Sequence, residues 1–202
     1  MMKKMILITV AISFVATLMF VWAGAKVVKV TGDAPFCGSC HSWDGLIAQT
    51  HFNDPIHGNA NPKGVQASCT DCHLPHSSLM AYLGVKARNG IAEGWTTLTG
   101  DESKKDWIAN REHARKNYTY DSSCLECHKG LLERASKAEF ADEQPSKMHL
   151  NYINFKGTKD EMQCTSCHKL VGHKDLGETL FKQKDTRPES WDAWEKQRKE
   201  KK

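Results

Sequence analysis

After its first 25 residues, this chain of 202 residues lacks long apolar runs and extended stretches with a two- or 3.6-residue hydrophobic period. The missing two-residue period argues against an extended sheet. The chain also has no cysteine outside four closely spaced pairs, although eight cysteines suggest a secreted disulfide framework at first sight. We therefore expect a mainly α fold with much irregular loop, organised around something other than a large apolar core.

A histidine directly follows each cysteine pair, in the segments CGSCH, CTDCH, CLECH and CTSCH. C-x-x-C-H is the attachment signature of a c-type haem, in which two thiols bind the porphyrin and the histidine ligates the iron. Zinc is the alternative, because paired C-x-x-C units can form tetrahedral thiolate sites. A zinc site does not require a histidine after every pair, so the pattern predicts four covalent haems c that supply much of the core.

The predicted attachment residues are Cys37, Cys40, Cys69, Cys72, Cys124, Cys127, Cys164 and Cys167. The predicted proximal iron ligands are His41, His73, His128 and His168. Successive first cysteines are 32, 55 and 40 residues apart, which predicts two haem pairs rather than an exact repeat. The polar interval 96–122 is the expected connection between the pairs.

Residues 5–25 carry no charge, and a helix of this length rises about 30 Å, the thickness of a bilayer's hydrocarbon core. A cleaved signal peptide is the alternative, since Ala23-Gly24-Ala25 has the small-x-small form of a cleavage site. The apolar run exceeds the roughly 7 to 15 residues of a signal peptide, which favours a retained transmembrane anchor. We expect an anchor over 1–25, a haem domain over 26–175 and a polar tail over 176–202.

Haems of this kind are attached outside the cytoplasmic membrane, so the haem domain is expected in the periplasm, anchored in the inner membrane. The formal charge of +4 omits the cofactors. A ferric haem with two ionised propionates carries about −1, so four haems cancel this excess. No nucleic-acid partner is predicted. The basic stretch 194–202 is expected to be a solvated tail, with docking as the alternative.

A low-spin electron-transfer haem needs a second axial ligand. Besides the four motif histidines, the candidates are His51, His57, His76, His113, His149 and His173.

Residues 77–90 predict an almost apolar helix that Ser77 or Ser78 caps and Gly90 ends. Such a helix is expected on the membrane surface with Lys86 at its boundary. The alternative is that Lys86 only extends its ammonium group to the lipid headgroups.

Together the N-terminal apolar segment, the four motifs, and the strings CTDCHLPH, MHLNYINF and CTSCHKLVGH resemble the NapC/NirT/NrfH family of membrane-anchored tetrahaem cytochromes. The likeness covers about residues 1–175 and is closest to the NapC and CymA-type quinol dehydrogenases. It implies that the protein takes electrons from the membrane quinol pool, from menaquinol in particular, and passes them to a periplasmic reductase or cytochrome.

The resemblance also implies roles for individual residues. The distal iron ligands would be His57, His149 and His173, leaving His51, His76 and His113 near the haems or on the surface. In the NrfH branch a methionine two residues after the first motif ligates the first iron. Trp43 occupies that position here, so the far side of this iron is expected to be open, water-bound or approached by Asp44.

For the quinol site, the resemblance implies a lysine and an acidic residue in the region of Lys86. Asn89 stands at the acidic position, and Glu93 or Asp44 are the candidates to replace it. Two alternatives remain open for the function: a tethered electron shuttle without its own quinol site, and an NrfH-type electron-donor subunit of a nitrite reductase complex. A homo-oligomer is compatible with either.

Overall fold

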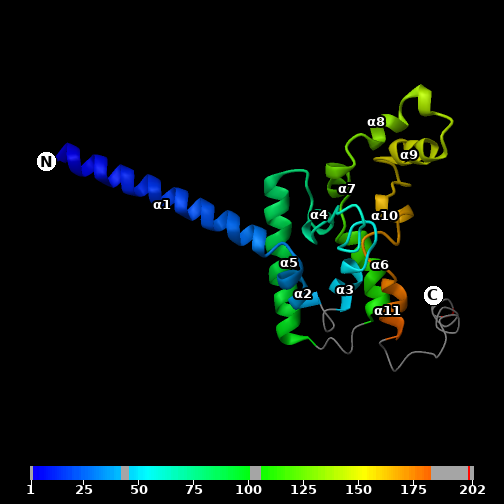
Figure 1. The fold of residues 1–202 in the computed structure, drawn as a ribbon, viewed down its shortest axis with the longest axis horizontal. Helices are drawn as coiled ribbons and strands as arrows, with labels where there is room; N and C mark the ends of the chain where they lie inside the picture. Colours follow the sequence, from blue (N-terminus) through cyan, green and yellow to red (C-terminus); the bar gives the residue numbers. More distant parts are fainter. Residues whose placement is uncertain (1, 42–45, 101–105, 183–199, 201–202) are drawn as a thin grey trace.

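The computed structural model describes residues 2–41, 46–100, 106–182 and 200. Its regular structure is helical, with no strand in these ranges, so the expectation of a mainly α fold with much loop is confirmed. One long helix projects from a body of shorter ones (Figure 1). The elements are α1 (Met2–Val30), α2 (Ala34–His41), α3 (Leu46–Phe52), α4 (Thr70–His73), α5 (Leu79–Thr99), α6 (Trp107–Asn117), α7 (Asp121–Cys127), α8 (Leu131–Ala135), η2 (Ala138–Phe140), α9 (Gln144–Phe155), α10 (Cys164–Cys167) and α11 (Leu176–Lys182).

Helix α1 extends away from the body, and none of its residues is buried (Figure 1). Its 29 residues span about 44 Å at 1.5 Å per residue, which exceeds the roughly 30 Å of a hydrocarbon core. Its length and composition fit a membrane-spanning helix. The helix continues beyond the expected boundary at residue 25, to Val30. Two residues after its end, a Cβ on the buried Gly32 would lie 3.3 Å from the Thr70 side chain, so the chain passes close to motif two there.

Helix α5 begins as expected, since the Ser78 hydroxyl accepts a hydrogen bond from the Ala81 N–H. The expected end at Gly90 is wrong: the helix continues to Thr99, and Gly100 closes it by donating its N–H to Thr96 O. A glycine inside a helix costs only about 1 kcal/mol relative to alanine. This cost is too small to end a helix without a further stop signal.

A small apolar core forms between α6 and α11. Trp107, Ile108 and Leu180 are its buried members, with 3%, 4% and 2% of their surfaces exposed. The interval 96–122, expected as a connection, thus contains a helix of the packed body. Helix α11 lies within the segment 176–202 that was assigned to the tail, so the packed body extends at least to Lys182. The basic stretch 194–202 lies outside the described residues except for residue 200.

The body buries few apolar side chains for its length. Six are buried in the described ranges: Leu74, Trp107, Ile108, Ala135, Tyr152 and Leu180. A domain stabilised by polypeptide alone needs a larger apolar core. The fold therefore depends on another component to fill its interior.

Candidate functional site

Each C-x-x-C-H motif lies in or beside a short helix. The motifs are called one (37–41), two (69–73), three (124–128) and four (164–168), and they belong to α2, α4, α7 and α10 in that order. Residues three apart lie on the same face of a helix, so the local fold turns the two thiols of a motif in one direction. The structure describes the backbone of Cys40 and His41 without their side chains, and the proximal role of His41 stays a prediction.

The motifs are grouped in two pairs. A hydrogen bond between the thiols of motifs one and two lowers the pKa of Cys37 to about 7 and raises that of Cys69. The same contact between motifs three and four lowers the pKa of Cys124 to about 7 and raises that of Cys164. This grouping of motifs is the one that their sequence spacing suggests.

A cavity of about 2430 Å³ runs through the body, and residues of all four motifs line it. A pocket for one drug-sized ligand usually measures about 300–1,000 Å³, so this cavity has room for several such groups. Its walls also contain the three histidines expected as distal ligands, His57, His149 and His173. Thiols and imidazoles around one large cavity fit covalently attached haem.

Three histidine pairs across this cavity have nearly equal separations. The ring centroids are 6.3 Å apart for His57 and His128, 6.2 Å for His73 and His173, and 6.2 Å for His149 and His168. An imidazole nitrogen binds a metal at about 2.0 Å and lies about 1.2 Å from its ring centre, so two rings on opposite sides of one iron are about 6.4 Å apart. Each pair joins one motif histidine to one expected distal histidine.

The hydrogen bonds of these histidines differ. The Nδ1 nitrogen of His73 lies 2.7 Å from Tyr118 O, and that of His173 lies 3.2 Å from Ile47 O. The buried Nδ1 nitrogens of His57 and His149 have no hydrogen-bond partner within the described ranges. Burial lowers the pKa of His57 and lowers that of His173 to about 4. Both rings are therefore neutral at pH 7, the state in which imidazole binds metals.

The other three histidines have different environments. His51 is buried, and its two ring nitrogens lie 2.7 Å from Gly172 O and 2.9 Å from Ala67 O. His76 Nε2 lies 3.2 Å from the backbone oxygen of Thr70, which follows the first cysteine of motif two. His113 is exposed.

The candidate quinol residues lie where α1, α5 and motif one meet. The Lys86 ammonium donates a hydrogen bond of 2.8 Å to Thr31 O, just after the end of α1. Burial lowers the pKa of Lys86, while the nearby Cys37 thiol opposes this shift. Lys86, Asn89 and Glu93 all line the large cavity. Their spacing places them on one face of α5.

Two residues named for this region, Trp43 and Asp44, lie outside the described residues. The part of the cavity wall that is described here combines the end of α1 with α5 and motif one, through Val28, Thr31, Cys37 and Lys86. An apolar wall with one cation is a suitable environment for a molecule that has a hydrophobic body and polar oxygens.

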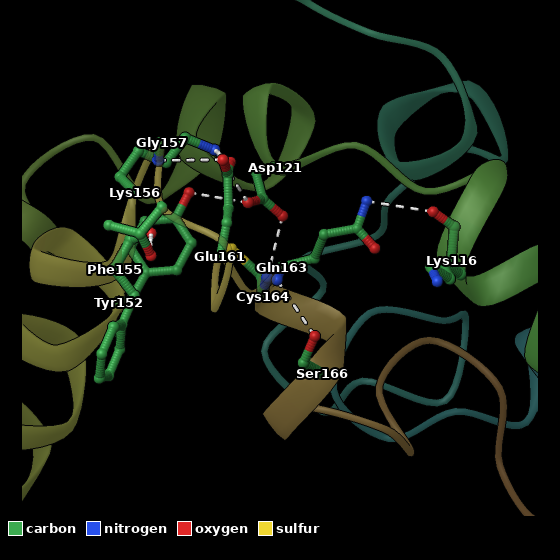
Figure 2. A network of polar contacts seen from close by, with 11 residues as sticks. Lys116, Asp121, Tyr152, Phe155, Lys156, Gly157, Glu161, Gln163, Cys164 and Ser166 are labelled. Atoms are coloured by element: carbon green, nitrogen blue, oxygen red, sulfur yellow. Dashed lines mark hydrogen bonds and ion pairs between the residues drawn. The ribbon is translucent and has the colours of Figure 1, made fainter.

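A polar network that was not predicted from the sequence connects α7, α9 and motif four (Figure 2). The Asp121 carboxylate accepts a hydrogen bond of 2.7 Å from the Tyr152 hydroxyl and one of 2.9 Å from the Cys164 N–H. The Lys156 ammonium lies 4.0 Å from this carboxylate and 2.6 Å from Glu161. One carboxylate thus holds motif four against the helix that carries His149.

The sequence does contain a signal for this network. Tyr152 follows His149 by three positions, and Asp121 precedes Cys124 by three positions. Each therefore shares a helix face with a residue of the candidate site. Gln163 extends the network, since its side-chain N–H donates to Lys116 O at 3.1 Å (Figure 2).

Comparison with known proteins agrees with this geometry. The profile of the NapC/NirT cytochrome c family, N-terminal region, matches residues 1–178. The chain belongs to the NapC/NirT cytochrome c family. The resemblance inferred from the motifs is thereby confirmed, over a slightly longer range than expected.

Individual members of the NapC/NirT family are similar to most of the chain. The cytochrome c-type protein TorC of Escherichia coli K12 is 28% identical over 188 residues, which are 89% of this chain and 45% of TorC. The denitrification system component NirT of Stutzerimonas stutzeri is 29% identical over 170 residues, 80% of this chain and 78% of NirT. A tetraheme cytochrome c-type protein of Allochromatium vinosum is 28% identical over 184 residues, 86% of this chain and 91% of that protein.

The chain thus spans less than half the length of TorC. No solved structure matches it. As a NapC/NirT cytochrome with an apolar N-terminal helix, it is a membrane-anchored multihaem cytochrome c that carries covalent haem c.

Proposed function

We propose that this NapC/NirT cytochrome carries four haems c on the periplasmic side of the inner membrane, oxidises membrane quinol, menaquinol in particular, and passes the electrons to a periplasmic terminal reductase. The observation that carries the proposal is the cavity that extends from all four motifs to the junction of α1 and α5. A cofactor chain in this cavity would connect the membrane boundary with the opposite end of the body.

The assignment of iron ligands follows from the three histidine pairs. Their separations of 6.2 to 6.3 Å support bis-histidine ligation at motifs two, three and four. The assigned pairs are His73 with His173, His128 with His57, and His168 with His149. For motif one we assign His41 as the proximal ligand. Haem iron held in this way supplies reversible one-electron chemistry.

The quinol site is proposed between α1, α5 and motif one. Quinol oxidation releases two protons with its two electrons, so the site needs a hydrogen-bond donor and a proton acceptor. The Lys86 ammonium is suited to bind a quinol oxygen, and its bond to Thr31 O orients it. Asn89 and Glu93 line the same wall, with Glu93 as the candidate proton acceptor. Asp44 remains a further candidate acceptor.

The outer face of α5 supports access from the membrane. Met80, Ile91, Trp95 and Leu98 expose 78%, 75%, 69% and 83% of their surfaces. At 100° per residue they form one stripe, directed away from the face of Lys86. In Figure 1, α5 forms the side of the body next to α1. We propose that this stripe lies in the membrane interface, where quinol can enter beside it.

Reduction of the detergent-purified holoprotein by a menaquinol analogue tests the quinol site. Replacing Lys86 by glutamine removes a charged donor whose hydrogen bond contributes about 1.5–3 kcal/mol, so the reduction rate should fall about ten- to a hundredfold. Lys129→Gln is the matched control, because Lys129 is an exposed surface residue paired with Glu126. An equal rate in both variants would remove Lys86 from the site. If the wild type is not reduced at all, the tethered shuttle becomes the better proposal.

Absorption and electron paramagnetic resonance spectra test the ligands. In His57→Ala, His149→Ala or His173→Ala, one low-spin haem should become high-spin, while the exposed control His113→Ala should leave the haems of motifs two, three and four low-spin. A pyridine haemochrome assay should give four haems per chain. Fewer haems, or a low-spin spectrum unchanged by all three variants, would contradict the assignment.

A further inference from the structure

Helix α3 holds three successive residues around His173. The Nδ1 nitrogen of His51 lies 2.7 Å from Gly172 O, and the N–H of Lys174 donates to Thr50 O at 3.0 Å. Between them, the Thr50 hydroxyl oxygen lies 3.1 Å from His173 Nδ1. The short helix that follows motif one thus contacts Gly172, His173 and Lys174, which lie more than 120 residues later in the sequence.

The protons around Thr50 determine the state of the His173 ring. The Thr50 hydroxyl donates its single proton to Ile47 O at 2.6 Å, so toward His173 it can only accept. Ile47 O, 3.2 Å from the same Nδ1, is also an acceptor. The proton therefore sits on Nδ1 of His173. In the ring with its proton on Nδ1, Nε2 carries the lone pair that a metal requires.

His51 connects this triplet to motif two. Its other ring nitrogen lies 2.9 Å from Ala67 O, two residues before Cys69. The segment that leads to the proximal His73 and the segment that carries His173 are therefore joined through one buried side chain.

The other two proposed distal ligands have no such arrangement. The Nδ1 nitrogens of His57 and His149 are buried without a hydrogen-bond partner in the described ranges. His73, opposite His173, does have one, since its Nδ1 lies 2.7 Å from Tyr118 O. At motif two, the Nδ1 nitrogens of both His73 and His173 thus have a hydrogen-bond acceptor that fixes the orientation of the ring. At motifs three and four, the distal rings have no such acceptor in the described ranges.

We propose that Thr50 and His51 are positioning residues for the second haem: they hold His173 with its proton on Nδ1 and Nε2 available opposite His73. The inference rests on the proposed His73 and His173 ligand pair. A histidine that donates its Nδ1 proton is a stronger electron donor to the metal, and this stabilises the ferric state. Thr50 and His51 therefore keep the potential of this one haem lower than it would be without them.

Redox titration of the full holoprotein, with electron paramagnetic resonance at each potential, tests this proposal. Thr50→Val removes the hydroxyl at nearly constant shape, and Thr50→Ser restores it. In Thr50→Val, Ile47 O remains as a weaker acceptor, so the double variant with His51→Gln should have the larger effect. The matched control is Thr158→Val, a threonine outside the motifs and outside the cavity wall, whose hydroxyl donates to Phe155 O at 2.8 Å.

We expect one of the four midpoint potentials to rise in Thr50→Val and to rise further in the double variant, where part of that haem becomes high-spin. Thr50→Ser should restore the wild-type value, and Thr158→Val should leave all four potentials unchanged. Unchanged potentials and spectra in the double variant would overturn the positioning role. If His173→Ala also produces no additional high-spin haem, the ligand assignment itself has failed, and the two failures are thus distinguished.

Discussion

Replacing Tyr152 with phenylalanine removes one hydroxyl and tests the network between motif four and α9. Tyr152 exposes only 8% of its surface, and its hydroxyl donates to Asp121 at 2.7 Å. Burial and this hydrogen bond raise the pKa of Tyr152, so the phenol keeps its proton at physiological pH. The variant leaves the Asp121 carboxylate with the Cys164 N–H and the more distant Lys156 ammonium as partners.

The expected loss follows from the kind of bond. A hydrogen bond to a charged group contributes about 1.5–3 kcal/mol to the free energy of unfolding. In a domain of this size, 1 kcal/mol lowers the melting temperature by roughly 2–4 °C, so Tyr152→Phe should lower it by about 3–12 °C. Asp121→Ala should cost more, because it leaves the buried hydroxyl without its partner.

Thermal unfolding of the holoprotein, followed by far-ultraviolet circular dichroism, measures this difference. Tyr120→Phe is the control, because the Tyr120 hydroxyl makes only an exposed contact of 3.5 Å to Asn117 O. Its melting temperature should stay within about 1–2 °C of the wild type. Equal melting temperatures for Tyr152→Phe and Tyr120→Phe would refute the idea that Asp121 and Tyr152 stabilise this part of the fold.

Four further predictions are checked by urea unfolding. Gly58→Ala should lower the free energy of unfolding by about 1–3 kcal/mol, because the new Cβ would overlap His51 O. Gly84→Ala should raise it by about 0.5–1 kcal/mol, because nothing lies within 4 Å of the new Cβ and alanine favours the helix α5. Leu180→Ala should cost about 2–5 kcal/mol by emptying the α6–α11 core, and an unchanged midpoint would mean that α11 does not pack there. Asp106→Ala removes the acceptor for two N–H groups at the start of α6 and should cost about 1 kcal/mol; no loss would contradict the capping role.

The sequence was sufficient for features whose signals are local. A motif of five residues contains its own chemistry, so the haem attachment residues could be predicted without a fold, and their assignment stays a prediction. The uncharged run 5–25 likewise predicted the anchor, because spanning a bilayer depends on length and composition alone. The cap at Ser78 was also predictable, since it involves contacts only three residues apart.

Other features depended on packing between distant segments. The continuation of α5 past Gly90 and the packing of α11 on α6 reflect contacts that periodicity does not report. The partner of Lys86 was equally hidden, because Thr31 O is a backbone atom 55 residues away. The expectation for the distal histidines came from a family resemblance, and it did not say which histidine belongs with which motif.

What the sequence alone determined, then, is the chemistry: four thiol pairs, each with a histidine beside it, and one apolar anchor. Only the tertiary structure decided the partners. It brings the ring centroids of His57 and His128 to 6.3 Å from each other and the Thr50 hydroxyl to 3.1 Å from His173 Nδ1. The physical reason is that covalent spacing constrains neighbours a few residues apart, whereas pairing across 71 or 123 residues depends on how the whole chain packs around its interior.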